Sequence, residues 1–176
     1  MNIFIIGPWW VWKTTTWTIL ANKIWLQFID LDQEFINHIW DITDYINNKW
    51  YEQYYKQNSN LFLSLVNKYK SNYVFALSSG FLTYTNDLTQ KHLKIIKENW
   101  TSILLLPSKS LKESTEIIVK RQLSRWFNLK YEKEKEKFKI RFWIYKKYWD
   151  IKIFSHKTPN EISDKIIKSL KIKFIL

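Results

Sequence analysis

Tryptophan and glycine occur in an unusual ratio in this chain. Its 176 residues include eleven tryptophans and only two glycines, whereas average usage of roughly 7% would give about 12 glycines. Glycine is the residue that takes a positive φ at helix ends and lets a ligand approach the backbone closely. A chain of this length has to make such turns, so either other residues make them under strain or tryptophan stands at glycine positions.

The placement of the tryptophans favours the second explanation. Residues 7–14 read G-P-W-W-V-W-K-T, and glycine in place of tryptophan turns this string into the phosphate-binding pattern G-x-x-x-x-G-K-T. Trp25, Trp40, Trp50 and Trp100 stand where helical stretches are expected to end, a position that commonly takes a left-handed glycine. We hypothesise that these are glycine codons translated with the wrong genetic code, or deliberate substitutions. The alternative is a protein that simply uses many tryptophans.

The composition predicts a single domain over residues 1–176, because this length supports one well-buried core. The absence of cysteine excludes disulfides and thiolate metal sites. The chain has no signal-like start and no apolar run of the roughly 18 residues that a membrane span needs. We therefore expect a cytoplasmic monomer without a membrane partner.

The net charge of +12 admits nucleic-acid binding, since basic proteins gain affinity by releasing counterions from phosphate backbones. The lysines are scattered, however, and the densest stretch, residues 131–137, alternates lysine with glutamate as a solvated helix face does. We expect no nucleic-acid partner. A steep salt dependence of binding would indicate otherwise.

Short apolar runs alternate with longer helical stretches, a pattern typical of a parallel sheet covered by helices. The predicted fold class is α/β, specifically a P-loop NTPase-like three-layer fold with a five-stranded parallel sheet. The predicted strands are residues 2–6, 26–29, 73–77, 102–106 and 151–154. The predicted helices are residues 13–24, 33–39, 42–48, 52–70, 89–99, 111–123, 131–148 and 159–171.

The string at residues 7–14 lies between the first predicted strand and helix, as a phosphate-binding loop requires. Lys13 would reach the β- and γ-phosphates of ATP, and the Thr14 hydroxyl would bind Mg²⁺. The side chains of Trp10 and Trp12 would fill the phosphate site, so we expect the chain as written to have impaired activity. An ordinary helix start is the alternative interpretation. The predicted nucleotide-binding residues here are Gly7, Pro8, Trp9, Trp10, Val11, Trp12, Lys13, Thr14 and Thr15.

Two carboxylates, Asp30 and Asp32, follow the second predicted strand. The carboxyl ends of strands are where ligands bind in open α/β sheets. One carboxylate can hold the metal while the other contacts a substrate hydroxyl. Asp32 could alternatively cap a helix that begins at Gln33.

These motifs, taken in order along the chain, resemble shikimate kinases. The phosphate loop is followed by F-I-D-L-D at residues 28–32, and F-A-L-S-S-G at 75–80 lies where the family has a glycine triplet that contacts shikimate. K-R-Q-L-S-R at 120–125 resembles the family's lid, and R-F-W-I-Y at 141–145 resembles its R-x-P-L-Y segment. The resemblance implies transfer of phosphate from ATP and Mg²⁺ to the 3-hydroxyl of shikimate, in aromatic amino-acid biosynthesis, with a lid at about residues 121–137.

The resemblance also implies a role for each matching residue. Lys13, Asp30 and Arg125 would be catalytic, with Asp30 beside Mg²⁺ and Arg125 closing over the transferred phosphoryl group. Thr14 and Asp30 would hold the metal, and Arg121 would join the nucleotide site. The shikimate-binding residues would be Asp32, Lys56, Ser78, Ser79, Gly80 and Arg141.

Two departures from the family pattern bear on the substrate. Ser78 and Ser79 replace two glycines of the triplet, and Tyr55 takes the place of an arginine that precedes Lys56. Either Lys56 supplies the second positive contact to the substrate carboxylate, next to that of Arg141, or the substrate differs.

Two other functions stay open. The chain could be another small-molecule P-loop kinase, such as a gluconate or nucleotide kinase, or a folded but catalytically inactive P-loop-fold binding module. A panel of hydroxy acids and nucleoside monophosphates would separate the kinases. The histidines, His38, His92 and His156, show no metal-ligand spacing and are expected to fill surface or core positions.

Overall fold

The computed structural model describes residues 2–8, 13–83, 87–99, 101–124 and 130–175. Its five described strands form one parallel sheet, as the sequence pattern predicted, and their order in the sheet is β2-β3-β1-β4-β5. The strands are β1 (Asn2–Ile6), β2 (Gln27–Asp30), β3 (Tyr73–Ala76), β4 (Thr101–Leu106) and β5 (Ile151–Phe154).

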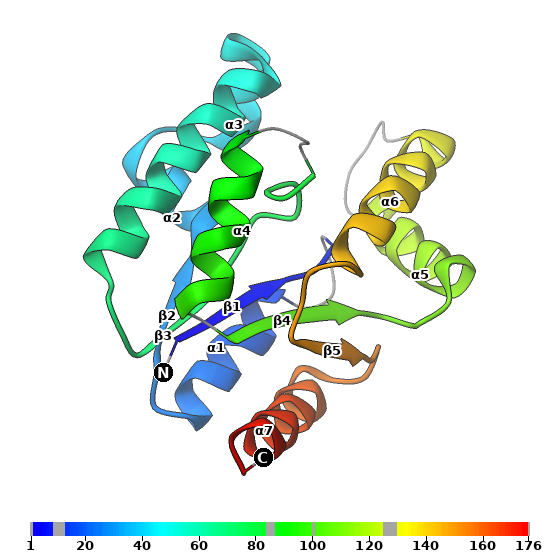
Figure 1. Ribbon diagram of the computed structural model, residues 1–176. Helices are drawn as coiled ribbons and strands as arrows, with labels where there is room; N and C mark the ends of the chain where they lie inside the picture. The colour runs from blue at the N-terminus through cyan, green and yellow to red at the C-terminus, as the bar shows by residue number, and fades with distance from the viewer. Residues whose placement is uncertain (1, 9–12, 84–86, 100, 125–129, 176) are drawn as a thin grey trace.

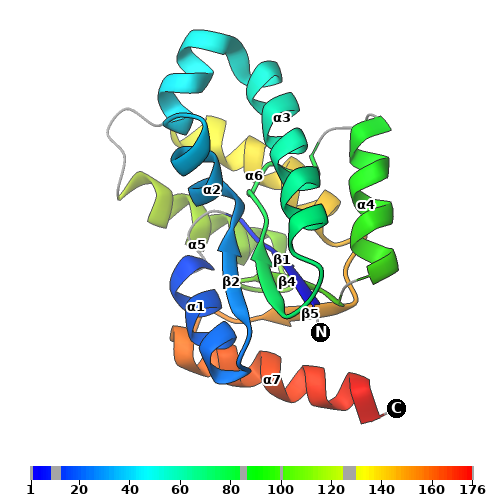
Figure 2. The ribbon, with the colours of Figure 1, turned by 90° about the vertical axis from the view of Figure 1, so that its left-hand side faces the viewer.

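Helices cover both faces of this sheet. Figures 1 and 2 show α1 and α7 packed together on one face and α3 and α4 on the other, while α5 and α6 stand side by side near the carboxyl ends of β1 and β4. The helices are α1 (Lys13–Lys23), α2 (Leu31–His38), α3 (Ile42–Lys68), α4 (Asp87–Asn99), α5 (Leu111–Leu123), α6 (Tyr131–Tyr145) and α7 (Pro159–Ile175). The predicted α/β fold class is confirmed.

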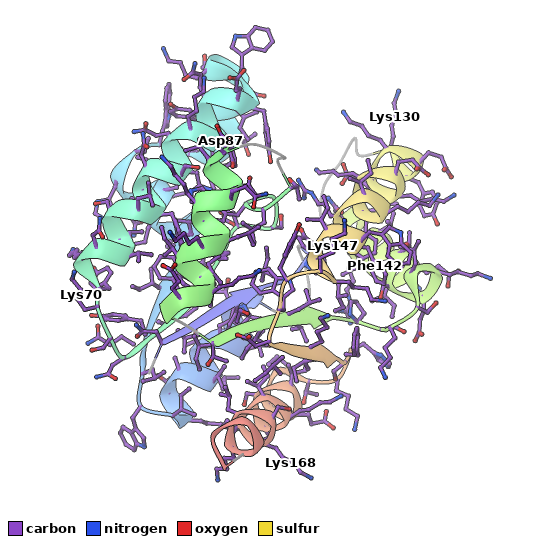
Figure 3. All side chains as sticks on the ribbon, in the orientation of Figure 1. Lys70, Asp87, Lys130, Phe142, Lys147 and Lys168 are labelled. Atoms are coloured by element: carbon purple, nitrogen blue, oxygen red, sulfur yellow. The ribbon has the colours of Figure 1, made fainter. Side chains whose placement is uncertain are left out.

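The core lies on both sides of the central strands. Every residue of β4 is buried, and so are Ile3 to Ile6 of β1. Strands covered on both faces have continuous apolar sequences rather than alternating ones, which explains why these runs could be recognised in the sequence. No described helix is long and apolar enough to cross a membrane. Figure 3 shows Lys70, Lys130 and Lys168 on separate parts of the surface, in keeping with scattered lysines.

Helix α5 has the predicted bounds, and the other helices differ from the prediction at one or both ends. Two of these differences bear on the site and on the tryptophans. Helix α2 begins at Leu31, two residues before the predicted start, because Asp30 and not Asp32 is its N-cap: the Asp30 carboxylate accepts hydrogen bonds from the backbone N–H groups of Asp32 and Gln33. The two helices predicted on either side of Trp50 form one element, α3, which has a kink at Trp50.

The tryptophans at helix ends behave differently from one another. Trp25 and Trp50 take positive φ values of 56° and 67°, the left-handed conformation that glycine favours. Trp40 follows the C-cap of α2 without a positive φ, and Trp100 lies outside the described residues. Of the three predicted helix-end tryptophans that the structure describes, Trp25 and Trp50 therefore have a positive φ and Trp40 does not.

Two further tryptophans, Trp17 and Trp149, are buried with an indole N–H that makes no hydrogen bond to the described residues. Trp17 lies in α1, and Trp149 precedes β5. A buried tryptophan N–H normally finds a partner, so each of these two indoles buries an unsatisfied donor.

Candidate active site

A cavity of about 220 Å³ lies at the carboxyl ends of the strands. Pro8, Asp32 and Ser78, which follow β1, β2 and β3 respectively, contribute to its lining. Helix α3 forms one wall, and α5 and α6 form the opposite wall, as their arrangement in Figure 1 allows. This is the edge of an open α/β sheet at which ligands bind.

A strand and a helix flank the predicted phosphate-binding residues, as a phosphate-binding loop needs. Gly7 and Pro8 are buried directly after β1, and α1 begins at Lys13. The N-terminus of α1 thus follows the carboxyl end of the central strand, where backbone N–H groups and the helix dipole favour an anion. Thr15 is exposed on the first turn of α1. The predicted residues Trp9, Trp10, Val11, Trp12 and Arg125 lie outside the described residues.

The structure brings the two predicted metal ligands together. Thr14 Oγ1 donates a hydrogen bond of 3.1 Å to Asp30 Oδ2. Asp30 Oδ1 accepts the two N–H groups at the start of α2, at 3.0 and 3.4 Å, so the two carboxylate oxygens have separate partners. Hydroxyl and carboxylate oxygens are ligands that Mg²⁺ prefers, usually together with substrate phosphates. The described residues contain no cluster of three or more His, Cys, Asp or Glu that could hold a metal ion by itself.

Of the two carboxylates that follow β2, Asp32 is the one that lines the cavity. Its Oδ1 accepts a hydrogen bond of 2.5 Å from Ser78 Oγ and a longer one of 3.5 Å from the Tyr54 hydroxyl. Asn58 Nδ2 donates to Ser78 Oγ at 3.1 Å. Burial and, secondarily, the Asp32 charge raise the pKa of Tyr54 well above its usual value, which keeps the phenol protonated as a donor. Asp32 is therefore fixed as an acceptor at the cavity wall.

Arg141 faces the same cavity from α6. Its Nη1 donates to Ser79 Oγ at 3.4 Å, and it is also hydrogen-bonded to the Tyr51 side chain. The Tyr145 hydroxyl donates to the backbone carbonyl of Ser79. A Cβ atom at Gly80 would lie 2.6 Å from the Tyr51 hydroxyl and 3.1 Å from Arg141 Nη2, so only glycine leaves room for this arrangement.

The structure does not bring Lys56 to the cavity. The Tyr55 side chain is buried and its hydroxyl shares a hydrogen bond of 2.9 Å with Thr89 Oγ1. The next residue of a helix points about 100° further round the axis. Accordingly, Lys56 is exposed and pairs with Glu52 at 2.8 Å. The expectation that Lys56 replaces the missing arginine is not met, because the phase of α3 directs it to solvent.

Three polar residues of the wall that α5 and α6 form were not predicted as site residues: Gln122, Glu134 and Lys137. Glu134 is buried. Its Oε2 accepts a hydrogen bond of 2.6 Å from Gln122 Nε2 and forms an ion pair with Lys137 Nζ at 3.5 Å. Glu134 and Lys137 belong to the alternation of lysine and glutamate at residues 131–137, which is typical of a solvated helix face. The available signal was their spacing, since Glu134, Lys137 and Arg141 share one face of a helix.

Arg121, predicted near the nucleotide, lies in the last turn of α5, on the same helix as Gln122 of the cavity wall. Burial lowers the pKa of its guanidinium. An arginine side chain stays protonated in proteins, so Arg121 remains a cation.

Comparison with known sequences identifies the family. The sequence profile described as shikimate kinase matches residues 11–171. The chain belongs to the shikimate kinase family. The family match confirms the resemblance predicted from the motifs, and this family is a family of kinases. Among curated proteins, none matches the chain.

Solved shikimate kinases have the same fold. The structure from Aquifex aeolicus superposes with a TM-score of 0.78 at 22% identity, covering 97% of this chain and 96% of that one. Shikimate kinase from Acinetobacter baumannii, solved in complex with shikimate, superposes with a TM-score of 0.79 at 17% identity, covering 98% of this chain and 93% of that one. Shikimate kinase from Bacteroides thetaiotaomicron superposes with a TM-score of 0.76 at 12% identity, covering 97% of this chain and 98% of that one. The P-loop NTPase-like fold is thereby established over nearly the whole chain.

Proposed function

We propose that the protein transfers the γ-phosphoryl group of MgATP to the 3-hydroxyl of shikimate, giving ADP and shikimate 3-phosphate. The observation that carries this proposal is the placement of Asp32 and Arg141 on one cavity of about 220 Å³. A hydroxy acid presents hydroxyl donors and a carboxylate at different places on a small ring, and the cavity offers a complementary acceptor and cation.

Arg141 would bind the substrate carboxylate through two parallel N–H groups, the geometry that a guanidinium permits. Its contacts with Ser79 and Tyr51 hold it in place before the substrate arrives. Asp32 would accept hydrogen bonds from the ring hydroxyls. Together they would fix the position of the reacting hydroxyl, and positioning supplies much of the rate in phosphoryl transfer.

Thr14 Oγ1 and Asp30 Oδ2 would hold Mg²⁺, whose charge neutralises the phosphate oxygens when it is bound. Lys13, at the start of α1, would contact the β- and γ-phosphates. Arg121 and Arg125 would come from the lid at about residues 121–137, with Arg125 stabilising the transferred group and the closed lid excluding water.

This activity belongs, on our proposal, to the chain with glycine at the tryptophan positions. The positive φ of Trp25 and Trp50 supports glycine at these two sites. The phosphate approaches a phosphate-binding loop too closely for large side chains. For the chain as written we expect no ATP turnover and weak or absent nucleotide binding.

The test is an assay coupled to ADP release, performed on the chain with tryptophan replaced by glycine at all eleven positions, called below the glycine-restored chain. Shikimate should stimulate ADP release, and Asp32→Asn or Arg141→Met should abolish the stimulation without unfolding the protein. ADP release that does not respond to shikimate would contradict the proposal.

A second candidate is a kinase for a different small hydroxylated substrate. The observation that favours it is Tyr55, which stands where the family has an arginine and bonds to Thr89 instead. Assays with gluconate and nucleoside monophosphates distinguish the two, since only one substrate should saturate at low concentration.

A further inference from the structure

Helix α6 presents two cations to the cavity. Lys137 and Arg141 both line it, and residues four apart on a helix lie on one face, about 5–6 Å apart at Cβ. Phe138, the residue after Lys137, is buried and also lines the cavity. Both cations thus line the cavity, although the Lys137 side chain is also 46% exposed.

Two like charges at this spacing disfavour each other. The pKa of Lys137 is lowered, mainly by burial and then by the charge of Arg141. The fold keeps both cations at the cavity despite this cost. An anionic group placed between them would offset it.

Lys137 is also held in position. Its Nζ lies 3.5 Å from Glu134 Oε2, and that oxygen accepts a hydrogen bond of 2.6 Å from Gln122 Nε2 on α5. Glu134 is only 5% exposed, so the carboxylate cannot move into solvent and take the lysine with it. By contrast, Lys139 pairs with Glu136 at 2.6 Å and does not line the cavity.

Among the described residues that line the cavity, Arg141 and Lys137 are the cations, whereas Lys56 faces solvent and pairs with Glu52. We infer that Lys137 determines specificity by binding the substrate carboxylate together with Arg141. Glu134 and Gln122 act as positioning residues for Lys137. The inference rests on the proposed function and deepens it, since it moves the second carboxylate contact from α3 to α6.

The test measures steady-state kinetics of the glycine-restored chain and of Lys137→Met, with shikimate and with its methyl ester. A charge-assisted hydrogen bond lost to a neutral side chain should raise KM for shikimate about 10- to 100-fold, while kcat changes little. The ester has no carboxylate charge, so parent and variant should use it equally poorly. Lys137→Arg should recover most of the affinity.

Lys139→Met, on the same helix, is the matched control and should leave KM unchanged. An unchanged KM in Lys137→Met, or an equal loss for shikimate and its ester, would overturn the role of Lys137 while leaving the kinase function standing. If the glycine-restored chain itself gave no shikimate-dependent turnover, the proposed function would fail, and the role of Lys137 would fail with it.

Discussion

Replacing Trp25 or Trp50 with glycine is expected to stabilise the protein. Both residues have a positive φ, 56° and 67°, which costs a side-chain-bearing residue on the order of 1–2 kcal/mol. Their side chains are 92% and 81% exposed, so glycine loses little buried surface. The greater freedom of glycine in the unfolded chain removes part of this gain. The net effect should be about 1 kcal/mol for each substitution.

Trp25 follows α1 and Trp50 lies at the kink of α3, so the two effects should add to about 2 kcal/mol in the double variant. For a domain of this size, that corresponds to a rise in Tm of about 4–8 °C. Urea unfolding, monitored by circular dichroism, measures the free energy directly, and an unchanged slope shows that only stability has changed.

Trp40 and Trp143 provide matched controls, because neither is among the described residues with a positive φ. Trp40 packs edge-on against Tyr45, and Trp143 lies within α6, where glycine costs about 1 kcal/mol relative to alanine. Glycine at either position should destabilise the protein. The reasoning would be refuted if all four substitutions changed stability in the same direction.

Three further outcomes are expected. His92 is fully buried, and burial lowers its pKa from 6.5 to about 4. The folded state therefore binds fewer protons than the unfolded state, so about 3 kcal/mol of stability should be lost as the pH falls from 6.5 to 4. Unfolding measured as a function of pH should show that His92→Leu removes this loss. Gly80→Ala should raise KM for shikimate by displacing Tyr51 and Arg141, and adding Tyr51→Phe should relieve part of the clash; equal KM values for parent and Gly80→Ala would contradict this. Thr14→Val should raise the Mg²⁺ concentration needed for half-maximal activity about tenfold or more by removing one oxygen ligand, and an unchanged Mg²⁺ titration would place the metal elsewhere.

The order of the elements could be predicted from the sequence because the central strands are covered on both faces. β1, β5 and α5 have the predicted bounds, since apolar runs and the turn residues around them identify such elements locally. The start of α2 was predicted incorrectly. Asp30 and Asp32 are equally good capping residues, and only the backbone at the end of β2 decides between them.

The site residues that could not be predicted from the sequence are those whose placement depends on contacts between helices. Lys56 follows Tyr55 in sequence, yet the phase of α3 turns it to solvent. Glu134 belongs to a lysine–glutamate alternation, and only its contact with Gln122 on α5 shows that one of these glutamates is buried. Local patterns predict which residues share a helix face, but not which neighbouring element covers that face.

The central claim is that a shikimate hydroxyl receives the phosphoryl group, and phosphorus NMR tests it most directly. The glycine-restored chain is incubated with ATP, Mg²⁺ and shikimate, and the phosphorus signals are followed over time. We predict that shikimate 3-phosphate and ADP form in equal amounts, and that the chain as written forms neither. ADP accompanied by inorganic phosphate, with no phosphorylated shikimate, would contradict the account.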